Sequence, residues 1–382
     1  MQVTPERLKE RLIDEAKRIG IDKIGFASAD PFIELKERLK ESREKGYASG
    51  FEEPDLDKRT RPELSLPGVK TIISVALAYP SKLKDPPKSE RGAYRGIFCR
   101  ASWGRDYHHV LRDKLNRLDG VLKEWVPHAG TAIMVDTGAL SDRAVAVRAG
   151  IGWSGKNTSV ITEEFGSWVY LGEMLTDVYI PPDEPVEDGC GDCDLCIRAC
   201  PTGALVAPGQ LNSQACIAFL TQTKGFVPDE YREKIGNRLY GCDTCQIVCP
   251  KNRKKHVDLH SEFRPDPELV KPLLKPLLDM SNREFKERFG EMAGSWRGKK
   301  PIQRNAILAL AHFRDKSSVS TLIRLMREDP RPVIRGTAAW ALGKIGGEGV
   351  RSALVEALRS ETDEEVRKEI EKGIRLAGEA AG

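Results

Sequence analysis

The chain has 382 residues, of which 40% are hydrophobic, and its formal net charge is +4. This length is typical of two or three domains of about 150 residues each. The small net charge excludes a strongly basic or strongly acidic protein, so a charged partner would have to contact local runs. No apolar run of the sequence approaches the ~18 residues that span a bilayer. We therefore expect a soluble, cytoplasmic protein with no membrane partner.

The first segment, "MQVTPERLKERLIDEAKR", predicts an amphipathic helix rather than a signal peptide, because charged residues occur close to its start. Thr4 is a suitable N-cap, and Pro5 suits the first turn. Leu8 and Leu12 share one face of this helix, and Gly20 predicts its end.

Short apolar segments then alternate with helical patterns over residues 1–180. The stretches "TIISVALAYP" (71–80) and "TAIMVD" (131–136) have the length and composition of buried strands. Residues 167–180 predict a further strand or a hairpin, and residues 107–125 predict a helix. This mixture indicates an α/β (α+β) layered domain.

The stretch "GIGWSGKNT" (150–158) resembles two nucleotide-binding patterns, G-x-G-x-x-G and the Walker loop. Both patterns follow a strand, whereas "SDRAVAVRA" predicts a helix, and Asn157 stands where a Walker loop has Ser or Thr. We therefore disfavour nucleotide binding. Lys156 and the glycine amides can still hold an anionic group, or the stretch can be only a helix C-cap and turn.

Two single residues of this region are candidates for a site. Asp136 ends an apolar strand, where catalytic side chains often lie. In one interpretation its apolar neighbours raise its pKa, so that it donates a proton near neutral pH. In the other it forms an Asx-turn or a helix N-cap. Cys99, in "GIFCRASWGRDYHH", has polar and aromatic neighbours that suit a cofactor wall or a surface loop, although most such cysteines are buried and inert.

Eight of the nine cysteines follow a linker, "PPDEPVEDG" (181–189), and fall within residues 190–260. In a reducing compartment such thiols are ligands or catalysts rather than disulfides. The first run has the spacing C-x2-C-x2-C-x3-C-P and consists of Cys190, Cys193, Cys196 and Cys200. The second run, of spacing C-x2-C-x3-C-P, consists of Cys242, Cys245 and Cys249. Cys216 can supply the ligand that the second run lacks.

These two runs predict two [4Fe–4S] clusters whose last ligands are exchanged. We assign one cluster to Cys190, Cys193, Cys196 and Cys249. We assign the other to Cys200, Cys216, Cys242 and Cys245. A pair of zinc sites with four thiolates each is the alternative, but the repeated C-x3-C-P pattern favours iron. Two clusters indicate an electron conduit without identifying what is reduced.

The C-terminal part of the sequence is repetitive. Similar stretches begin at Arg304, Arg335 and Arg367, 31 and then 32 residues apart. This period predicts HEAT-type helix pairs, which serve either as a structural cap or as a concave recognition surface. Two basic runs, "KNRKKH" and "SWRGKKPIQR", are either solvated faces or phosphate contacts.

Taken together, six features of the sequence resemble the epoxyqueuosine reductase family, over essentially the whole chain. They are "KRTRPELSLPGVKTIISVALAY", "FCRASWGRDYH", "VDTGALSDRAVAVRAGIGWSGKNT", "CGDCDLCIRACPTGAL", "YGCDTCQIVCP" and the terminal repeats. That family is related to the cobalamin-dependent reductive dehalogenases. The sequence departs from the family pattern in one place, with "GWSGKN" where "GWIGKN" is expected.

The resemblance implies a cobalamin-binding catalytic domain (1–180), a ferredoxin-type two-cluster domain (181–265) and a HEAT-like repeat domain (266–382). Cobalamin is expected base-off with no histidine on cobalt, and "DYHHVL" lacks the glycine of the D-x-H-x-x-G ligand motif. Asp136 matches the family's proposed proton donor. The residues that match positions lining the corrin are Arg59, Cys99, Asp136, Asp243 and Thr244.

The implied reaction is the two-electron reduction of the epoxide of epoxyqueuosine, in a tRNA anticodon stem-loop, to the alkene of queuosine. Electrons would come from an external donor of flavodoxin or ferredoxin type, and the protein would be a monomer. With this substrate, Lys254 and Lys255 become candidates for tRNA contact.

Two alternatives stay open. One is a dehalogenase-like cobalamin enzyme that acts on a small molecule, and the basic runs and repeats argue against it. The other is a ferredoxin-type electron carrier, which would leave the large N-terminal domain without a role.

Overall fold

The computed structural model describes residues 4–379, and its first helix begins at the predicted capping residue. Helix α1 (Pro5–Ile19) has Thr4 as its N-cap, whose hydroxyl accepts the Arg7 N–H at 3.4 Å. The helix ends at Gly20, which adopts the left-handed conformation that glycine tolerates best. The prediction of this helix is therefore confirmed at both ends. Among residues 4–379, no helix combines the length and apolar character of a membrane span.

The chain divides into two units, and each unit is assembled from three separate stretches of sequence. The first unit consists of Met1–Lys82, Gly104–Cys216 and Asp243–Arg264. The second unit consists of Leu83–Trp103, Ile217–Cys242 and Pro265–Gly382. The predicted domains are three contiguous segments, whereas each of these two units combines three separate segments. The division into units therefore does not test the predicted boundaries at residues 180 and 265, which stay predictions.

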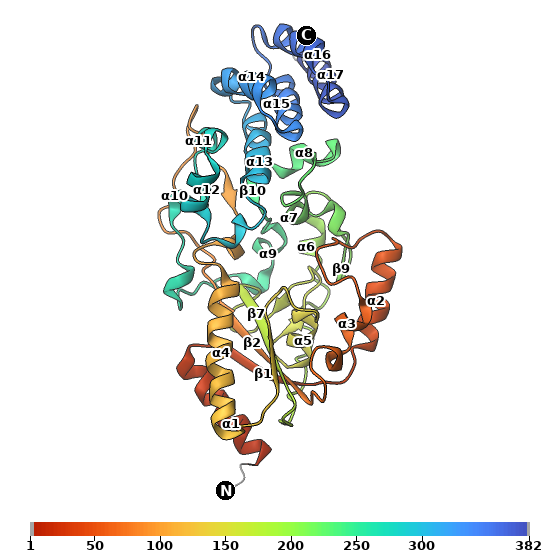
Figure 1. The fold of residues 1–382 in the computed structure, drawn as a ribbon, viewed down its shortest axis with the longest axis vertical. Helices are drawn as coiled ribbons and strands as arrows, with labels where there is room; N and C mark the ends of the chain where they lie inside the picture. The colour runs from red at the N-terminus through yellow and green to blue at the C-terminus, as the bar shows by residue number, and fades with distance from the viewer. Residues whose placement is uncertain (1–3, 380–382) are drawn as a thin grey trace. The chain divides into compact units, whose positions relative to one another are not determined.

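A four-stranded antiparallel sheet forms the centre of the first unit (Figure 1). In sheet order the strands are β1 (Lys23–Ser28), β2 (Thr71–Ala78), β7 (Val169–Thr176) and β4 (Thr131–Met134). Strand β2 is buried along its whole length, as its mainly apolar sequence predicts. Residues 167–180 hold the single strand β7, so the strand interpretation was right and the hairpin interpretation wrong.

Helices cover both faces of this sheet, which gives the predicted layered α+β architecture. Helix α4 (Tyr107–Trp125) packs against β4, β7 and α1, and α5 (Asp142–Arg148) packs against β1, β2 and β7. Leu175 of β7 joins the buried cluster that contains α5 residues. Because side chains alternate along a strand, Glu173 of β7 faces α5 as well.

In the described part of the chain, the first unit contains eight further α-helices and β-strands. They are α2 (Ile33–Glu44), α3 (Leu56–Thr60), β5 (Trp153–Ser154), β6 (Val160–Ile161), α6 (Leu195–Arg198), β8 (Leu205–Ala207), β9 (Gln210–Leu211) and α9 (Thr244–Ile247). The strands β5 and β6 pair antiparallel, as do β8 and β9.

The second unit is mainly helical, with one short parallel pair between β3 (Ile97–Phe98) and β10 (Arg238–Tyr240). Its shorter helices are α7 (Ile217–Leu220), α8 (Asp229–Ile235), α10 (Pro267–Val270), α11 (Leu274–Asp279) and α12 (Asn282–Phe289). The repeat helices are α13 (Lys299–His312), α14 (Val319–Glu328), α15 (Pro332–Ile345), α16 (Val350–Ser360) and α17 (Glu364–Glu379).

The arginines that mark the sequence repeat lie near the starts of alternate helices, and their side chains form hydrogen bonds with neighbouring segments. Arg304 is only 1% exposed, and its guanidinium donates to the backbone carbonyls of Leu220, Thr223 and Gly225. Arg367 likewise donates to two backbone carbonyls at the end of α16. Guanidinium groups that bond the backbone of neighbouring segments in this way stabilise the stacking of helices. For these residues the contacts favour the structural-cap interpretation.

Candidate functional site

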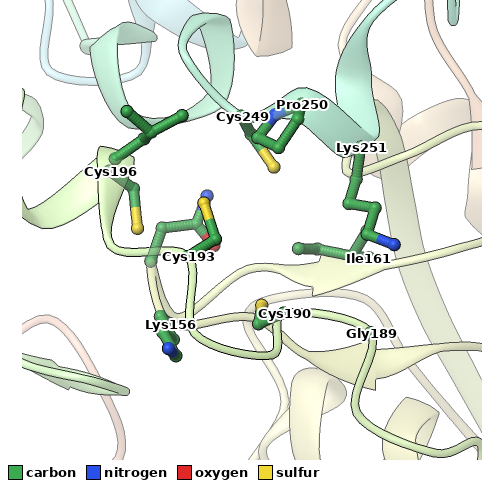
Figure 2. A pocket seen from close by; sticks show the side chains of 11 residues that line it. Lys156, Ile161, Gly189, Cys190, Cys193, Cys196, Cys249, Pro250 and Lys251 are labelled. Atoms are coloured by element: carbon green, nitrogen blue, oxygen red, sulfur yellow. The ribbon is translucent and has the colours of Figure 1, made fainter.

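Four of the predicted ligands line one cavity of the first unit. These residues are Cys190, Cys193, Cys196 and Cys249. Their sulfur atoms point toward a common space, although Cys249 is distant in sequence from the other three (Figure 2). The space between these residues, including the part that is open to solvent, has a volume of about 350 Å³.

The local structure explains how the thiols reach this cavity. The Cys193 N–H donates to the Cys190 carbonyl at 3.2 Å, which closes a tight turn just before α6. Cys249 follows α9 and is buried. Burial raises the pKa of the Cys249 thiol, and the nearby Cys190 and Cys193 raise it further.

Soft thiolates gathered around one space are a donor set that suits an iron–sulfur cluster. Within residues 4–379, no three His, Cys, Asp or Glu side chains are placed to hold one metal ion together. The thiol chemistry of the four cysteines fits the first predicted cluster.

The second predicted ligand set is distributed differently. Cys200, Cys216 and Cys245 belong to the first unit, whereas Cys242 is the last residue of a stretch of the second unit. Burial raises the pKa of Cys200, but backbone N–H groups and the Thr202 hydroxyl outweigh it and lower the pKa. A lowered pKa favours the thiolate, which is the form of cysteine that ligates metals.

The nucleotide-like stretch forms a support for the cysteine loop. Helix α5 precedes it, as predicted, and its Gly-Lys turn connects β5 to β6. The Lys156 ammonium donates to the Gly191 carbonyl, with 2.5 Å between nitrogen and oxygen. Lys156 therefore contacts the loop between two predicted cluster ligands, and neither earlier interpretation of this lysine included that contact.

Asp136 lies on a strained turn just after β4. Its φ is +55°, and the Thr137 N–H donates to the Val135 carbonyl across it at 2.5 Å. Such three-residue turns and left-handed non-glycine residues are uncommon and concentrate at functional sites. The carboxyl group is well exposed, with 64% of the side chain accessible. The Asp136 side chain is thus accessible to a bound reactant.

The protonation of Asp136 differs from the sequence-based interpretation. His108, at the start of α4, lies between two carboxylates, with Nδ1 2.6 Å from Asp106 and Nε2 3.4 Å from Asp136. Burial lowers the pKa of His108, but the two acids outweigh it and raise it to about 9. The imidazolium in turn lowers the pKa of Asp136. The expectation of a raised pKa is therefore wrong, because a cation replaces the apolar neighbours that the sequence indicated.

Two further carboxyl groups stand behind the Asp136 turn. The Asp136 N–H donates to Oδ2 of Asp142 at 2.7 Å, which fixes the left-handed backbone. Burial is the main cause that raises the pKa of Asp142 to about 6. Glu173 is fully buried beneath α5, and burial, followed by the charge of Asp142, raises its pKa well above the ordinary range. Burial therefore favours the protonated, neutral form of Glu173.

The other residues predicted to line a corrin are found in both units. Arg59, Asp243 and Thr244 belong to the first unit and Cys99 to the second. Arg59 Nε is buried and has no hydrogen-bond partner in the described part of the chain. Burial also lowers the pKa of the Arg59 guanidinium. A buried donor of this kind fits a bound group that offers amide or carboxylate oxygens, as the rim of a corrin does.

The two basic candidates for tRNA contact differ in their surroundings. Lys254 is exposed and has a φ of +61°. Lys255 is half-buried, and its ammonium donates to the Glu163 carbonyl at 2.6 Å. Lys254 is therefore the better candidate for contact with a phosphate.

Sequence reasoning did not connect His108, Asp106, Asp142 or Glu173 with Asp136. The short "DYHH" stretch was considered as part of a cofactor wall and as a possible cobalt ligand, but not as a partner of that acid. A glutamate inside the apolar run "VYLGEMLT" was a second signal. Charged residues are rarely buried in a strand unless they have a partner, so this glutamate indicated a special environment.

Three family models match separate segments of the chain. Residues 59–137 match "Epoxyqueuosine reductase QueG, DUF1730", residues 189–252 match "4Fe-4S double cluster binding domain", and residues 297–375 match "HEAT repeats". The second match decides against the zinc alternative, and the third confirms the predicted repeats.

Relatives match over nearly the whole chain. The epoxyqueuosine reductase of Bacillus cereus is 65% identical, over 97% of this chain and 98% of its own length. A crystal structure of an epoxyqueuosine reductase with an epoxyqueuosine-modified tRNA-Tyr stem-loop is 63% identical, with a TM-score of 0.97 over 98% of this chain and all of that one. A structure of the Bacillus subtilis enzyme, whose aspartate catalytic loop is swung out of the active site, is 62% identical, with a TM-score of 0.96 over 98% of this chain and 100% of that one.

Proposed function

The chain belongs to the epoxyqueuosine reductase family, and on that premise we propose that it reduces the epoxide of epoxyqueuosine in tRNA to the alkene of queuosine. The observation that carries the proposal is the 65% identity to the Bacillus cereus enzyme across 97% of this chain and 98% of that one. An RNA substrate is supported by the 63%-identical structure that holds a modified tRNA stem-loop. The same full-length similarity argues against both the small-molecule dehalogenase and the electron-carrier alternatives.

The reaction requires two electrons and two protons, and the epoxide oxygen leaves as water. We assign the first cluster to the four cysteines of the shared cavity, and the second to Cys200, Cys216, Cys242 and Cys245. An external flavodoxin- or ferredoxin-type donor in the reducing cytoplasm supplies the electrons, and the chain acts as a monomer. Cobalamin, when bound, supplies a low-potential metal centre that delivers electrons to the epoxide.

Five residues are proposed to line the corrin: Arg59, Cys99, Asp136, Asp243 and Thr244. Arg59 supports this assignment because its buried Nε lacks a partner among residues 4–379. Its guanidinium would donate to an oxygen of the bound group and recover that lost hydrogen bond.

The proton is proposed to come from the pair formed by Asp136 and His108. Asp136 is the exposed member, and His108, whose pKa is about 9, holds the proton at neutral pH. As negative charge develops on the epoxide oxygen, the proton held by His108 passes to that oxygen through the Asp136 carboxylate. The relative whose aspartate catalytic loop moves supports an aspartate on a loop in this role.

The decisive experiment is anaerobic reconstitution with iron, sulfide and cobalamin, followed by an assay on tRNA that contains epoxyqueuosine. The expected product is queuosine in the tRNA, dependent on both iron and cobalamin. Full loading with both cofactors and no conversion of the nucleoside would contradict the proposed function.

The pH dependence of turnover should report His108. Turnover is expected to decline as pH rises through about 9, because the His108 pKa is raised to that value and the proton is lost above it. Asp106→Asn should move this decline to lower pH, since it removes one of the two acids that raise the pKa. Asparagine is also a good N-cap, so α4 should still form. An unchanged alkaline limb in this variant would remove His108 from the proton path.

Lys254 and Lys255 are proposed to contact tRNA phosphates, with Lys254 contributing more. Lys254→Asn removes the charge while tolerating the left-handed backbone, and it should weaken binding of the stem-loop. The slope of log K against log salt should fall by about 0.7, the value for one phosphate contact on a single strand. Lys255→Gln should have a smaller effect, because that ammonium already bonds the Glu163 carbonyl. Fluorescence anisotropy at several salt concentrations measures both, with the exposed helical lysine in Lys17→Gln as the control.

A further inference from the structure

We propose that Lys156 sets the reduction potential of the cluster held by Cys190, Cys193, Cys196 and Cys249, by placing a positive charge on the loop that wraps it. The inference rests on the proposed function, which supplies that cluster. It also gives a role to the "GIGWSGKNT" stretch, which no part of the proposed reaction has used.

The geometry places Lys156 directly against the cysteine loop. Its side chain lines the same cavity as the four sulfur atoms (Figure 2). Its ammonium donates to the carbonyl of Gly191, the residue after Cys190, at 2.5 Å. The contact joins residues 35 positions apart, so it is a tertiary contact rather than a local turn.

The Lys156 turn is itself held firmly. The Gly155 N–H donates to the Ser159 carbonyl at 2.8 Å, and the Gly209 N–H donates to the Lys156 carbonyl at 2.9 Å. A Cβ on Gly155 would lie 2.6 Å from Cδ1 of Ile161 and 2.7 Å from Oδ1 of Asn157, so the turn packs closely against these side chains. The backbone that carries the lysine is therefore fixed on both sides.

The positive charge of Lys156 and its hydrogen bond to Gly191 both stabilise the reduced form of the cluster, and therefore both raise its reduction potential. A [4Fe–4S] cluster with four thiolates is an anion, and reduction adds one more negative charge. A nearby ammonium stabilises the reduced state more than the oxidised state, and cluster charge and hydrogen bonding are known to set potentials. A donor on the Gly191 carbonyl also polarises that peptide bond, so its N–H, which belongs to Asp192 inside the loop, becomes more positive.

Lys251 offers a comparison within the same cavity. It also lines the space, but its ammonium lies over the Trp153 ring, 5.7 Å from the ring centre. The cation is thus held by an aromatic face, and within residues 4–379 its ammonium makes no hydrogen bond to the cysteine loop between residues 190 and 196. We therefore assign the larger influence on the potential to Lys156.

The test is a redox titration of the reconstituted full chain, followed by electron paramagnetic resonance of the reduced clusters. Lys156→Met removes charge and donor, Lys156→Gln removes the charge but keeps a donor, and Lys156→Arg keeps both. At a fixed potential, the ratio of reduced to oxidised first cluster should fall about tenfold in the Met and Gln variants, equivalent to about 59 mV for one electron. The Arg variant should match the wild type, and the second cluster of each sample serves as an internal control.

A wild-type potential in both Lys156→Met and Lys156→Gln, at full iron content, would overturn the inference while leaving the proposed function standing. A shift in the Met variant alone would also overturn it, because the hydrogen bond rather than the charge would then be responsible. Failure of the wild-type chain to form any cluster would instead refute the proposed function.

Discussion

Cys249→Ala is expected to destroy the cluster built on Cys190, Cys193 and Cys196, and to spare the cluster that includes its own neighbours in sequence. The four thiols share one cavity, and Cys249 is its most buried ligand. Three remaining thiolates leave one iron of a [4Fe–4S] cube without protein ligation. About half of the iron and sulfide should therefore be lost on anaerobic reconstitution, and reduction of the epoxide should stop because electrons no longer pass.

The measurement is iron and sulfide content together with the resonance signals of the reduced clusters. Cys99→Ser is the matched control, since that thiol lies outside both cysteine runs, and it should keep the full iron content. If Cys249→Ala loses the signal of the other cluster and retains this one, the exchanged ligation is wrong.

Asp136→Asn should lower turnover by roughly 10²–10⁴-fold, the usual contribution of a general acid, with little change in stem-loop affinity. Asparagine is the informative substitution because Asp136 has a φ of +55°, which asparagine tolerates and alanine does not. The Asp136 N–H can still donate to Asp142, so the turn is expected to persist. A loss of activity can then be attributed to the carboxyl group rather than to a rearranged loop.

Single-turnover conversion of modified tRNA measures this effect, with stem-loop binding and cofactor content measured on the same sample. Asp113→Asn, at an exposed position of α4, controls for the loss of one acidic charge. Wild-type conversion by Asp136→Asn would exclude Asp136 as the proton donor.

Much of the fold could be predicted from local signals in the sequence. Thr4 and Gly20 mark the ends of α1, and the apolar runs mark β2 and β4, because caps and strand burial depend on a few neighbouring residues. The repeat period predicted the helices around Arg304 and Arg335 for the same reason. Strand order was not predicted, since nothing local in β4 indicates that it pairs with β7.

Only part of the candidate site could be predicted from the sequence. Asp136 was found because it follows a strand, but the sign of its pKa shift was wrong. That sign depends on His108, which is far away along the chain and reaches Asp136 only because α4 packs on β4 and β7. Glu173 was missed because its neighbour Asp142 is on α5, across a layer of the fold.

The amino-acid sequence by itself determined the chemistry of this protein: soft thiolates in a spacing that allows two clusters, a lone acid after a strand, and a helical repeat. These properties can be recognised in short stretches of sequence, because each of them depends on the identity and spacing of a few residues. Only the tertiary structure decided which groups meet, because the contacts of Cys249 with the first cysteine loop, of Lys156 with Gly191 and of His108 with Asp136 are each closed by packing between distant segments.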